Sequence, residues 1–256
     1  MKKNFIYLAF SLSCIGMLFS CTSEMDEFDD FQNAVVSRSV STTSSLTYPI
    51  SSFAQECSFS GEDLSEFEEM LSLMQSYDYM GHVYNPLFEY AKNGGNKLSS
   101  IGRDSNISTQ GGYNPRTKAI LINSAASISN VFPEEFIHFS QDIYYPGGTT
   151  QYITKGKPNI EMEAKIIEDC AALYGSVCSY YGAGPTYAEQ YRQWVWDFVY
   201  ESIDNFPSMN DVLTHKVSNI GYRDFVEDLK KKDASYNYES LNSLNPILID
   251  FIYNKL

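Results

Sequence analysis

The chain is poor in the residues that most often hold metals or cross-link a fold. It has 5 cysteines and 3 histidines in 256 residues, and it contains neither a C-x-x-C pair nor a Cys/His zinc cluster. Cys170 and Cys178 fall in one predicted helix, about 12 Å apart along its axis, which is too far for a disulfide. Cys57 could pair with either of them, but we expect all three to be buried thiols.

Positive charge is also scarce. The chain has 18 lysines and arginines against 32 aspartates and glutamates, so its formal net charge is -14 at pH 7. Proteins that bind nucleic acid present basic surface to the phosphates, and a chain this acidic lacks that surface. We therefore exclude nucleic acid as a partner.

The N-terminus has the features of a secretory signal. Two lysines precede an apolar run from Phe5 to Phe19, which is too short and wrongly flanked for a membrane-spanning helix. The run ends in the sequence LFSC at residues 18–21, which resembles a bacterial lipobox, where the cysteine becomes the lipidated first residue of the mature chain. We predict a signal peptide over residues 1–20 and lipidation of Cys21; ordinary signal cleavage near this point is the alternative.

Residues 21–52 are predicted to form a flexible tether. An acidic stretch follows Cys21 and resembles the export tag that sends some lipoproteins to the outer face of the outer membrane; the alternative is a plain solvated tether. Residues 37–52 are rich in serine and threonine and lack core-forming periodicity. We expect an outer-membrane lipoprotein exposed at the cell surface, with the membrane as a partner through the lipid and a folded domain over residues 53–256.

Hydrophobic periodicity predicts a mainly α (α+β) domain. Helices are expected over Glu62–Tyr79, from Pro86 to Gly94, and over Asn159–Tyr181. A small sheet or hairpin should precede the helix that begins near Pro133, because Ile101–Pro115 is predicted as loop or weak hairpin and Lys118–Asn123 as a strand. Further helices are predicted after a capping box at Thr186-x-x-Glu189 and over Asn210–Lys216, Tyr222–Lys231 and Pro246–Tyr253.

The most informative motif is PEEFIHFSQ at residues 133–141, just after the predicted strand. It has the form of the zinc-peptidase motif H-E-x-x-H with the first histidine replaced by Glu134. In the intact motif, two histidines four residues apart hold Zn²⁺ from one face of a helix, and the intervening Glu is the general base. Glu135 keeps the position of the base and His138 that of the second ligand. Glu134 shares a helix face with His138, so a carboxylate oxygen could stand where an imidazole nitrogen belongs.

The helix predicted from Asn159 carries an acid on its apolar face. Glu163 falls on the apolar stripe of this helix. Periodicity directs Glu161, Lys165 and Glu168 to the other side. Because a carboxylate is buried at high cost without a partner, Glu163 should meet a cation, a metal or several hydrogen-bond donors.

The strand, the helix with E-x-x-H-x-x-Q and the helix opening with NIEMEA together resemble the zincin-like lipoproteins of Gram-negative bacteria, over roughly Lys118 to Cys178. Members of that family usually have H-E-x-x-H-x-x-Q and a later E-x-E-A. For zincins of the gluzincin type, the resemblance implies that the strand before the active helix binds an extended peptide. It also implies that a Glu on the next helix completes the metal site.

The resemblance assigns a role to each matching residue. Glu135 would be the catalytic base, and Glu134 and His138 would be metal ligands. Glu163 would be the third ligand, preferred to Glu161 because it lies on the apolar stripe. Gln141 is either a polar neighbour that supports a ligand or a surface residue.

Three functions remain open from the sequence. The first is a cell-envelope lipoprotein with a zincin-like fold and a degenerate, catalytically impaired metal site, acting in binding or a structural role without a cofactor. The second is an active metallopeptidase whose Glu134, His138 and Glu163 hold zinc or a harder divalent cation such as Mn²⁺. The third is a surface lipoprotein that binds glycan, peptide or protein through exposed rings of the Trp/Tyr-rich segment 187–200.

Overall fold

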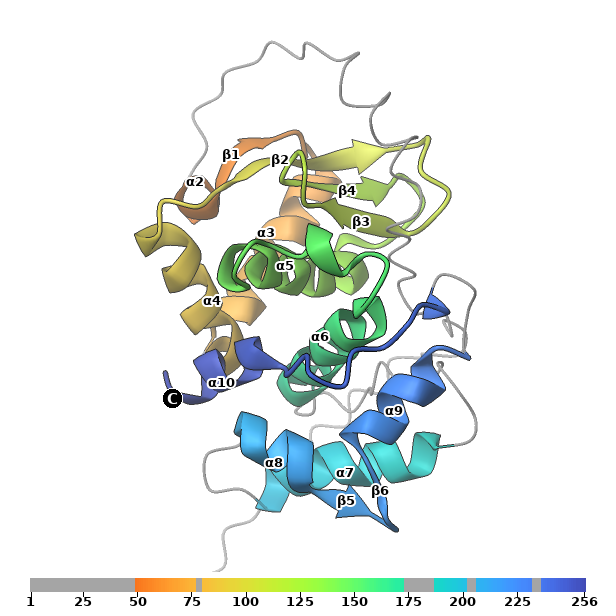
Figure 1. Cartoon of the computed structure of the whole chain (residues 1–256). Helices are drawn as coiled ribbons and strands as arrows, with labels where there is room; N and C mark the ends of the chain where they lie inside the picture. The colour runs from red at the N-terminus through yellow and green to blue at the C-terminus, as the bar shows by residue number, and fades with distance from the viewer. Residues whose placement is uncertain (1–48, 77–79, 173–186, 202–205, 232–235) are drawn as a thin grey trace, which may run out of the picture.

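The computed structural model describes residues 49–76, 80–172, 187–201, 206–231 and 236–256. A sheet lies at one end of the molecule, with α3 (Glu62–Gln75) and α5 (Ile128–Tyr144) packed under it and α4 (Gly81–Asn93) beside them (Figure 1). Next comes α6 (Lys157–Ala172), followed by a group of shorter helices at the other end. The predicted α+β class is confirmed at this level. The predicted signal peptide, Cys21 and most of the tether lie outside the described residues.

Four strands form one mixed sheet in the order β1-β2-β4-β3. Three of them, β1 (Ala54–Cys57), β2 (Leu98–Asp104) and β4 (Ala119–Asn123), are parallel neighbours. At one edge, β3 (Gly111–Asn114) runs antiparallel to β4. The segment predicted as loop or weak hairpin therefore supplies most of β2 and all of β3.

The strand predicted before the motif helix is confirmed as β4, but its expected role is wrong. β4 pairs with β2 on one side and with β3 on the other, so neither of its edges is open to an extended peptide. The edge next to the motif helix belongs to β3. A Cβ atom on Gly111 of β3 would lie 2.4 Å from Val131 Cγ1, so glycine is what allows α5 to pack this closely against the edge strand.

An aromatic cluster joins the first helices to the motif helix. Phe136 stacks on Phe88 with ring centroids 4.4 Å apart, and Phe132 meets Phe67 edge to face at 4.7 Å. Phe53, at the end of α2 (Ile50–Phe53), packs against Phe136 at 5.5 Å. Each such pair adds about 0.5–1.5 kcal/mol beyond the area it buries. Because α2 is part of this core, the packed domain begins slightly before the predicted boundary at residue 53.

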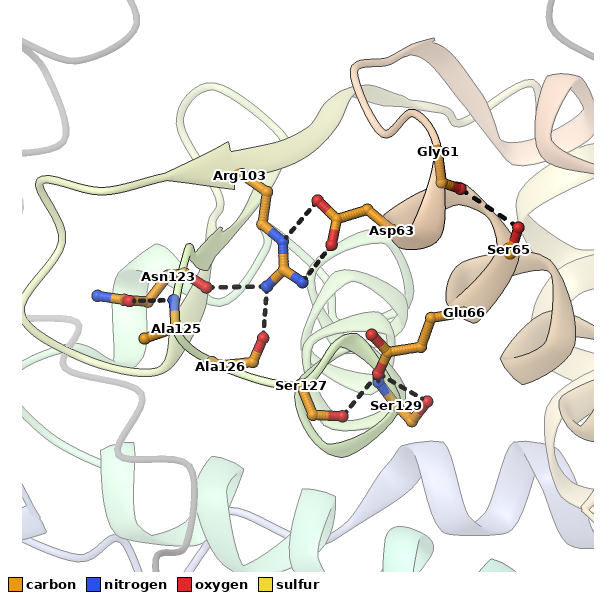
Figure 2. A network of polar contacts seen from close by, with 10 residues as sticks. All are labelled: Gly61, Asp63, Ser65, Glu66, Arg103, Asn123, Ala125, Ala126, Ser127 and Ser129. Atoms are coloured by element: carbon orange, nitrogen blue, oxygen red, sulfur yellow. Dashed lines mark hydrogen bonds and ion pairs between the residues drawn. The ribbon is translucent and has the colours of Figure 1, made fainter.

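Two carboxylates fix the turn that leads from β4 into α5 (Figure 2). Asp63 of α3 accepts two hydrogen bonds from the Arg103 guanidinium, at 2.7 and 3.1 Å, and Arg103 also donates to the backbone carbonyl of Asn123 at 2.8 Å. Glu66, one turn further along α3, accepts from the Ser127 hydroxyl at 2.7 Å and from the Ser129 backbone N–H at 3.0 Å. A negative charge at a helix N-terminus is favourable, so Glu66 serves as the N-terminal cap of the motif helix.

The predicted helices of the second half are largely present. They are α7 (Ala188–Glu201), α8 (Met209–Thr214), α9 (Tyr222–Leu229) and α10 (Ile247–Tyr253), with a hairpin of β5 (Lys216–Val217) and β6 (Ile220–Gly221). The predicted helix Asn159–Tyr181 is present from Lys157 to Ala172, and its remainder lies outside the described residues. Pro86 was predicted to start a helix, but α4 begins at Gly81 because the apolar residues before the proline are buried. Within the described part, no helix is both long and apolar enough to cross a membrane.

The remaining sequence predictions concern thiols and rings. Cys57 is half-buried and Cys170 is buried, both as free thiols whose pKa values burial raises. Cys178 lies outside the described residues.

In the Trp/Tyr-rich segment, Tyr191 and Trp194 are fully buried against Phe225, and Trp196 is exposed. This segment is therefore mainly helix core.

Candidate functional site

The motif residues of α5 face α6 in the interior of the domain. His138 Nε2 lies 3.5 Å from Glu161 Oε2 on α6 and 4.0 Å from Glu134 Oε1 on its own helix. One ligand atom each from Glu134, His138 and Glu161 lies within 4.8 Å of the others, so this group could hold a metal ion. All three side chains are at least 95% shielded from solvent, with residue exposures of 1%, 4% and 0%.

The structure corrects the predicted third member of the group: it is Glu161 and not Glu163. Periodicity was expected to separate an inward Glu163 from an outward Glu161, yet both are fully buried. The helix α6 is covered by α5 on one side and by α4, α7, α9 and α10 on others, so it has almost no solvent face. An apolar stripe cannot distinguish directions on a helix that is buried all round.

Glu163 instead meets hydrogen-bond donors, one of the partners expected for it. Its Oε2 accepts from Gln141 Nε2 at 2.9 Å and from the Tyr145 hydroxyl at 2.8 Å. Its Oε1 accepts from the backbone N–H groups of Leu248 at 2.8 Å and Ile249 at 3.3 Å. This carboxylate therefore caps the start of α10 and holds the C-terminal helix on α6.

Gln141 is a buried neighbour that orients His138, which decides between its two predicted roles. Gln141 Nε2 donates to two acceptors, the Ile160 carbonyl and the Glu163 carboxylate, each at 2.9 Å. The amide oxygen must then face His138 Nδ1, 2.8 Å away, so Nδ1 carries the proton and donates. The other ring nitrogen, Nε2, is thereby directed towards Glu161 and Glu134.

Lys165 is the residue that the sequence reasoning missed. Its Nζ is bonded to Glu134 Oε1, and both side chains are almost completely buried. Lys165 lies one turn after Glu161 on α6, as Glu134 lies one turn before His138 on α5. The two helices therefore face each other through two ion pairs of opposite polarity, one turn apart. A signal was present in the sequence, because Lys157, Glu161 and Lys165 alternate in charge at four-residue spacing on one helix face.

The charges of this group support one another. Burial opposes the charged imidazolium, but Glu161 together with Glu135 and Glu134 outweighs it and raises the pKa of His138 to about 10. Burial likewise raises the pKa of Glu161, but His138 together with Lys157 and Lys165 outweighs it and lowers this pKa to about 2. For Lys165, burial is again outweighed, here by Glu134 and other negative neighbours, and the pKa lies well above its ordinary value. His138, Glu161 and Lys165 are thus charged at neutral pH.

Glu135 contacts the edge strand. Its Oε2 accepts the backbone N–H of Tyr113 on β3 at 2.7 Å. The Asn123 backbone N–H of β4 donates to the Gln110 carbonyl, so the backbone groups of residue 110 point towards β4. In an antiparallel pair, successive residues of a strand direct their backbone groups alternately towards the partner strand and away from it. Tyr113 is three residues further on, so its N–H points away from β4. Burial is the main reason why the pKa of Glu135 is raised to about 7.

A divalent cation fits the geometry of the group but not its present charges. Two carboxylates and an imidazole are suitable ligands for zinc or manganese. However, Glu134 is already bonded to the Lys165 ammonium and Glu161 is paired with His138. A second buried lysine, Lys157, lies one turn before Glu161. With Lys165 in place, an added ion would stand beside an existing buried cation.

Comparison with protein-family models, with curated proteins and with solved structures finds no match to this chain.

Proposed function

We propose that this chain is a cell-envelope lipoprotein with a zincin-like domain whose peptidase-type site does not hydrolyse peptides, and that the domain acts in binding or in a structural role. The arrangement of the sheet supports the zincin-like assignment. An antiparallel edge strand precedes a parallel strand, the motif helix follows, and the next helix supplies the partner carboxylate Glu161.

The observation that carries the proposal is the hydrogen bond from the Tyr113 N–H to Glu135. A general base must reach the water that it activates, and a peptide bound at the sheet edge must pair with the outward backbone groups of that edge. Here the Tyr113 N–H of the edge strand donates to the Glu135 carboxylate inside the protein, and Glu135 is fully buried. The carboxylate is therefore not free to activate water, and this N–H is not free to bind a peptide.

The experiment is a peptidase assay on the purified protein. A mixed peptide library is incubated with the wild type and with Glu135→Ala, each with zinc, with manganese and with chelator, and products are identified by mass spectrometry. We expect no cleavage that depends on Glu135. Cleavage by the wild type that requires a metal and disappears in Glu135→Ala contradicts the proposal.

The envelope part of the proposal is supported by the N-terminal sequence and has its own test. Expression in a Gram-negative host with a fatty-acid analogue should label the wild type, and Cys21→Ser should not be labelled. Accessibility of the labelled protein to an added protease on intact cells then tests surface exposure. Equal labelling of both proteins contradicts lipidation at Cys21.

An active metallopeptidase with Glu134, His138 and Glu161 as ligands is the second candidate. It is favoured by the pKa of about 7 on Glu135, which suits a general base at neutral pH. In that case a bound metal would supply Lewis acidity, and Glu135 would take the proton from water after releasing the Tyr113 N–H. The peptidase assay distinguishes the two candidates.

A further inference from the structure

We propose that the Lys165 side chain takes the place of the metal ion in this site, and that removing it turns Glu134, His138 and Glu161 into a binding site for Zn²⁺ or Mn²⁺. The inference rests on the proposed function, since it explains how a peptidase-type site can persist without a metal. It adds that the Lys165 ammonium occupies the site, and that the wild type cannot bind a metal ion there while this ammonium is present.

In an intact H-E-x-x-H helix, the residue at the position of Glu134 contributes a ligand to the metal. Here the atom bonded to Glu134 is Lys165 Nζ, which comes from the next helix, one turn from Glu161. The ammonium thus reaches the shared group from the same helix that supplies the third carboxylate.

Glu134 and Glu161 are two carboxylates whose nearest oxygens lie 4.0 and 3.5 Å from the same imidazole nitrogen. Buried charges this close require compensating cations. Lys165 supplies one of them as part of the chain, so it cannot dissociate and does not depend on metal supply. A divalent cation would have to displace it from Glu134.

Replacing Lys165 by methionine removes the charge but keeps most of the side-chain volume. Methionine matches the length and apolar character of the lysine stem but carries no charge. Glu134 then loses the ammonium bonded to its Oε1, while His138 Nδ1 still donates to Gln141 and directs Nε2 towards the carboxylates. Two oxygens and one nitrogen within 4.8 Å are left with one uncompensated charge. Zinc and manganese accept such a set of ligands once His138 Nε2 gives up its proton to solvent, so metal binding here releases one proton.

The test is calorimetric titration of Zn²⁺ and Mn²⁺ into the full mature protein. The variants are Lys165→Met, the double variant Lys165→Met/His138→Ala, and the matched control Lys157→Met. Lys157 lies on the same helix face and is equally buried, but its Nζ lies 5.1 Å from the centre of the Tyr238 ring and has no hydrogen bond within the described residues.

We expect one equivalent of metal to bind Lys165→Met at least about 100-fold more tightly than it binds the wild type, because the uncompensated carboxylate gains a cation. The control Lys157→Met removes a charge that also acts on Glu161 but is not bonded to Glu134, so it should gain far less than Lys165→Met, and removing His138 from Lys165→Met should abolish the gain. A wild type that binds as tightly as Lys165→Met overturns the inference. So does a folded Lys165→Met that binds no better than the wild type.

If Lys165→Met does not fold in chelator, thermal unfolding monitored by circular dichroism decides the question. If adding Zn²⁺ restores a folded protein that shows a cooperative thermal transition, the inference is supported. If the chain stays unfolded at saturating Zn²⁺, the inference is contradicted. The peptidase assay is independent of these results. If the wild type cleaves no peptide and Lys165→Met binds no metal, only the role of Lys165 is overturned. If the wild type cleaves peptides, the proposed function is overturned.

Discussion

Lys165 of α6 and Glu134 of α5 form an ion pair in the interior of the domain, with side-chain exposures of 1% and 2%. The pair stands one helical turn from a second one, between His138 and Glu161. Removing one partner of a buried pair leaves an uncompensated charge, whereas removing both leaves none. This asymmetry makes the pair testable without any ligand.

The first prediction is a double-mutant cycle in metal-free buffer. Glu134→Gln and Lys165→Met should each lower the free energy of unfolding by about 3–5 kcal/mol, because each leaves the other charge buried alone. The double variant should be more stable than either single variant. Urea unfolding measures all four proteins, and strictly additive effects would show that the two side chains do not interact.

The fold was largely predictable because its signals are local. Each of these signals depends only on residues close by in the sequence. They are the amphipathic start of α3 at Glu62, the alternation in the predicted strand 118–123 and the glycine after α4. The sheet order was not predictable, since the pairing of β1 and β2 with strands elsewhere in the sequence is a tertiary outcome. The strand signal of β3 is weak because two of its four residues are glycines. This too is a tertiary effect, since the packing of α5 requires a small residue at Gly111.

The candidate site was predictable on α5 and not on α6. The spacing of Glu134, Glu135 and His138 is fixed by one helix, so the sequence places them correctly. The choice between Glu161 and Glu163 depended on which side of α6 faces α5, and that helix is buried on both sides. The alternating charges of Lys157, Glu161 and Lys165 are the better guide in this protein, because four-residue spacing puts all three on one helix face and the structure buries them together.

The second prediction concerns pH. The pKa of His138 is about 10 in the fold, against about 6.5 for an unperturbed histidine. A folded pKa above the unfolded one means that the pair with Glu161 stabilises the fold fully below about pH 6.5 and progressively less as the pH rises towards 10. His138→Gln should therefore be most destabilising near pH 6, and the difference from the wild type should shrink by about pH 9.

Glu161→Gln is the matched variant for this pH series. It removes the carboxylate that raises the pKa of His138, so it should flatten the same part of the stability profile. Urea unfolding across the range supplies the measurement. A difference between His138→Gln and the wild type that does not change with pH would show that the imidazole is neutral in the folded protein.

The third prediction tests the cap of the motif helix. Glu66→Ala removes the acceptor of the Ser127 hydroxyl and the Ser129 N–H (Figure 2), and should lower the free energy of unfolding by about 0.5–2 kcal/mol. Glu69→Ala, at an exposed position of the same helix, should change it by less than about 0.5 kcal/mol. Equal effects of the two substitutions in thermal and urea unfolding would rule out a capping role.

The fourth prediction concerns the link between α6 and the C-terminal helix. Glu163→Gln keeps the size of the side chain but replaces one of two oxygens, each of which accepts two hydrogen bonds, by a donor. At least one donor then faces another donor in a buried place, which should lower the free energy of unfolding by about 1–3 kcal/mol. Hydrogen exchange of the Leu248 and Ile249 amides should accelerate most if the oxygen turns towards Gln141. The exposed Glu239→Gln should leave both stability and exchange unchanged, and protection of these amides that survives in Glu163→Gln would mean that packing alone holds α10 in place.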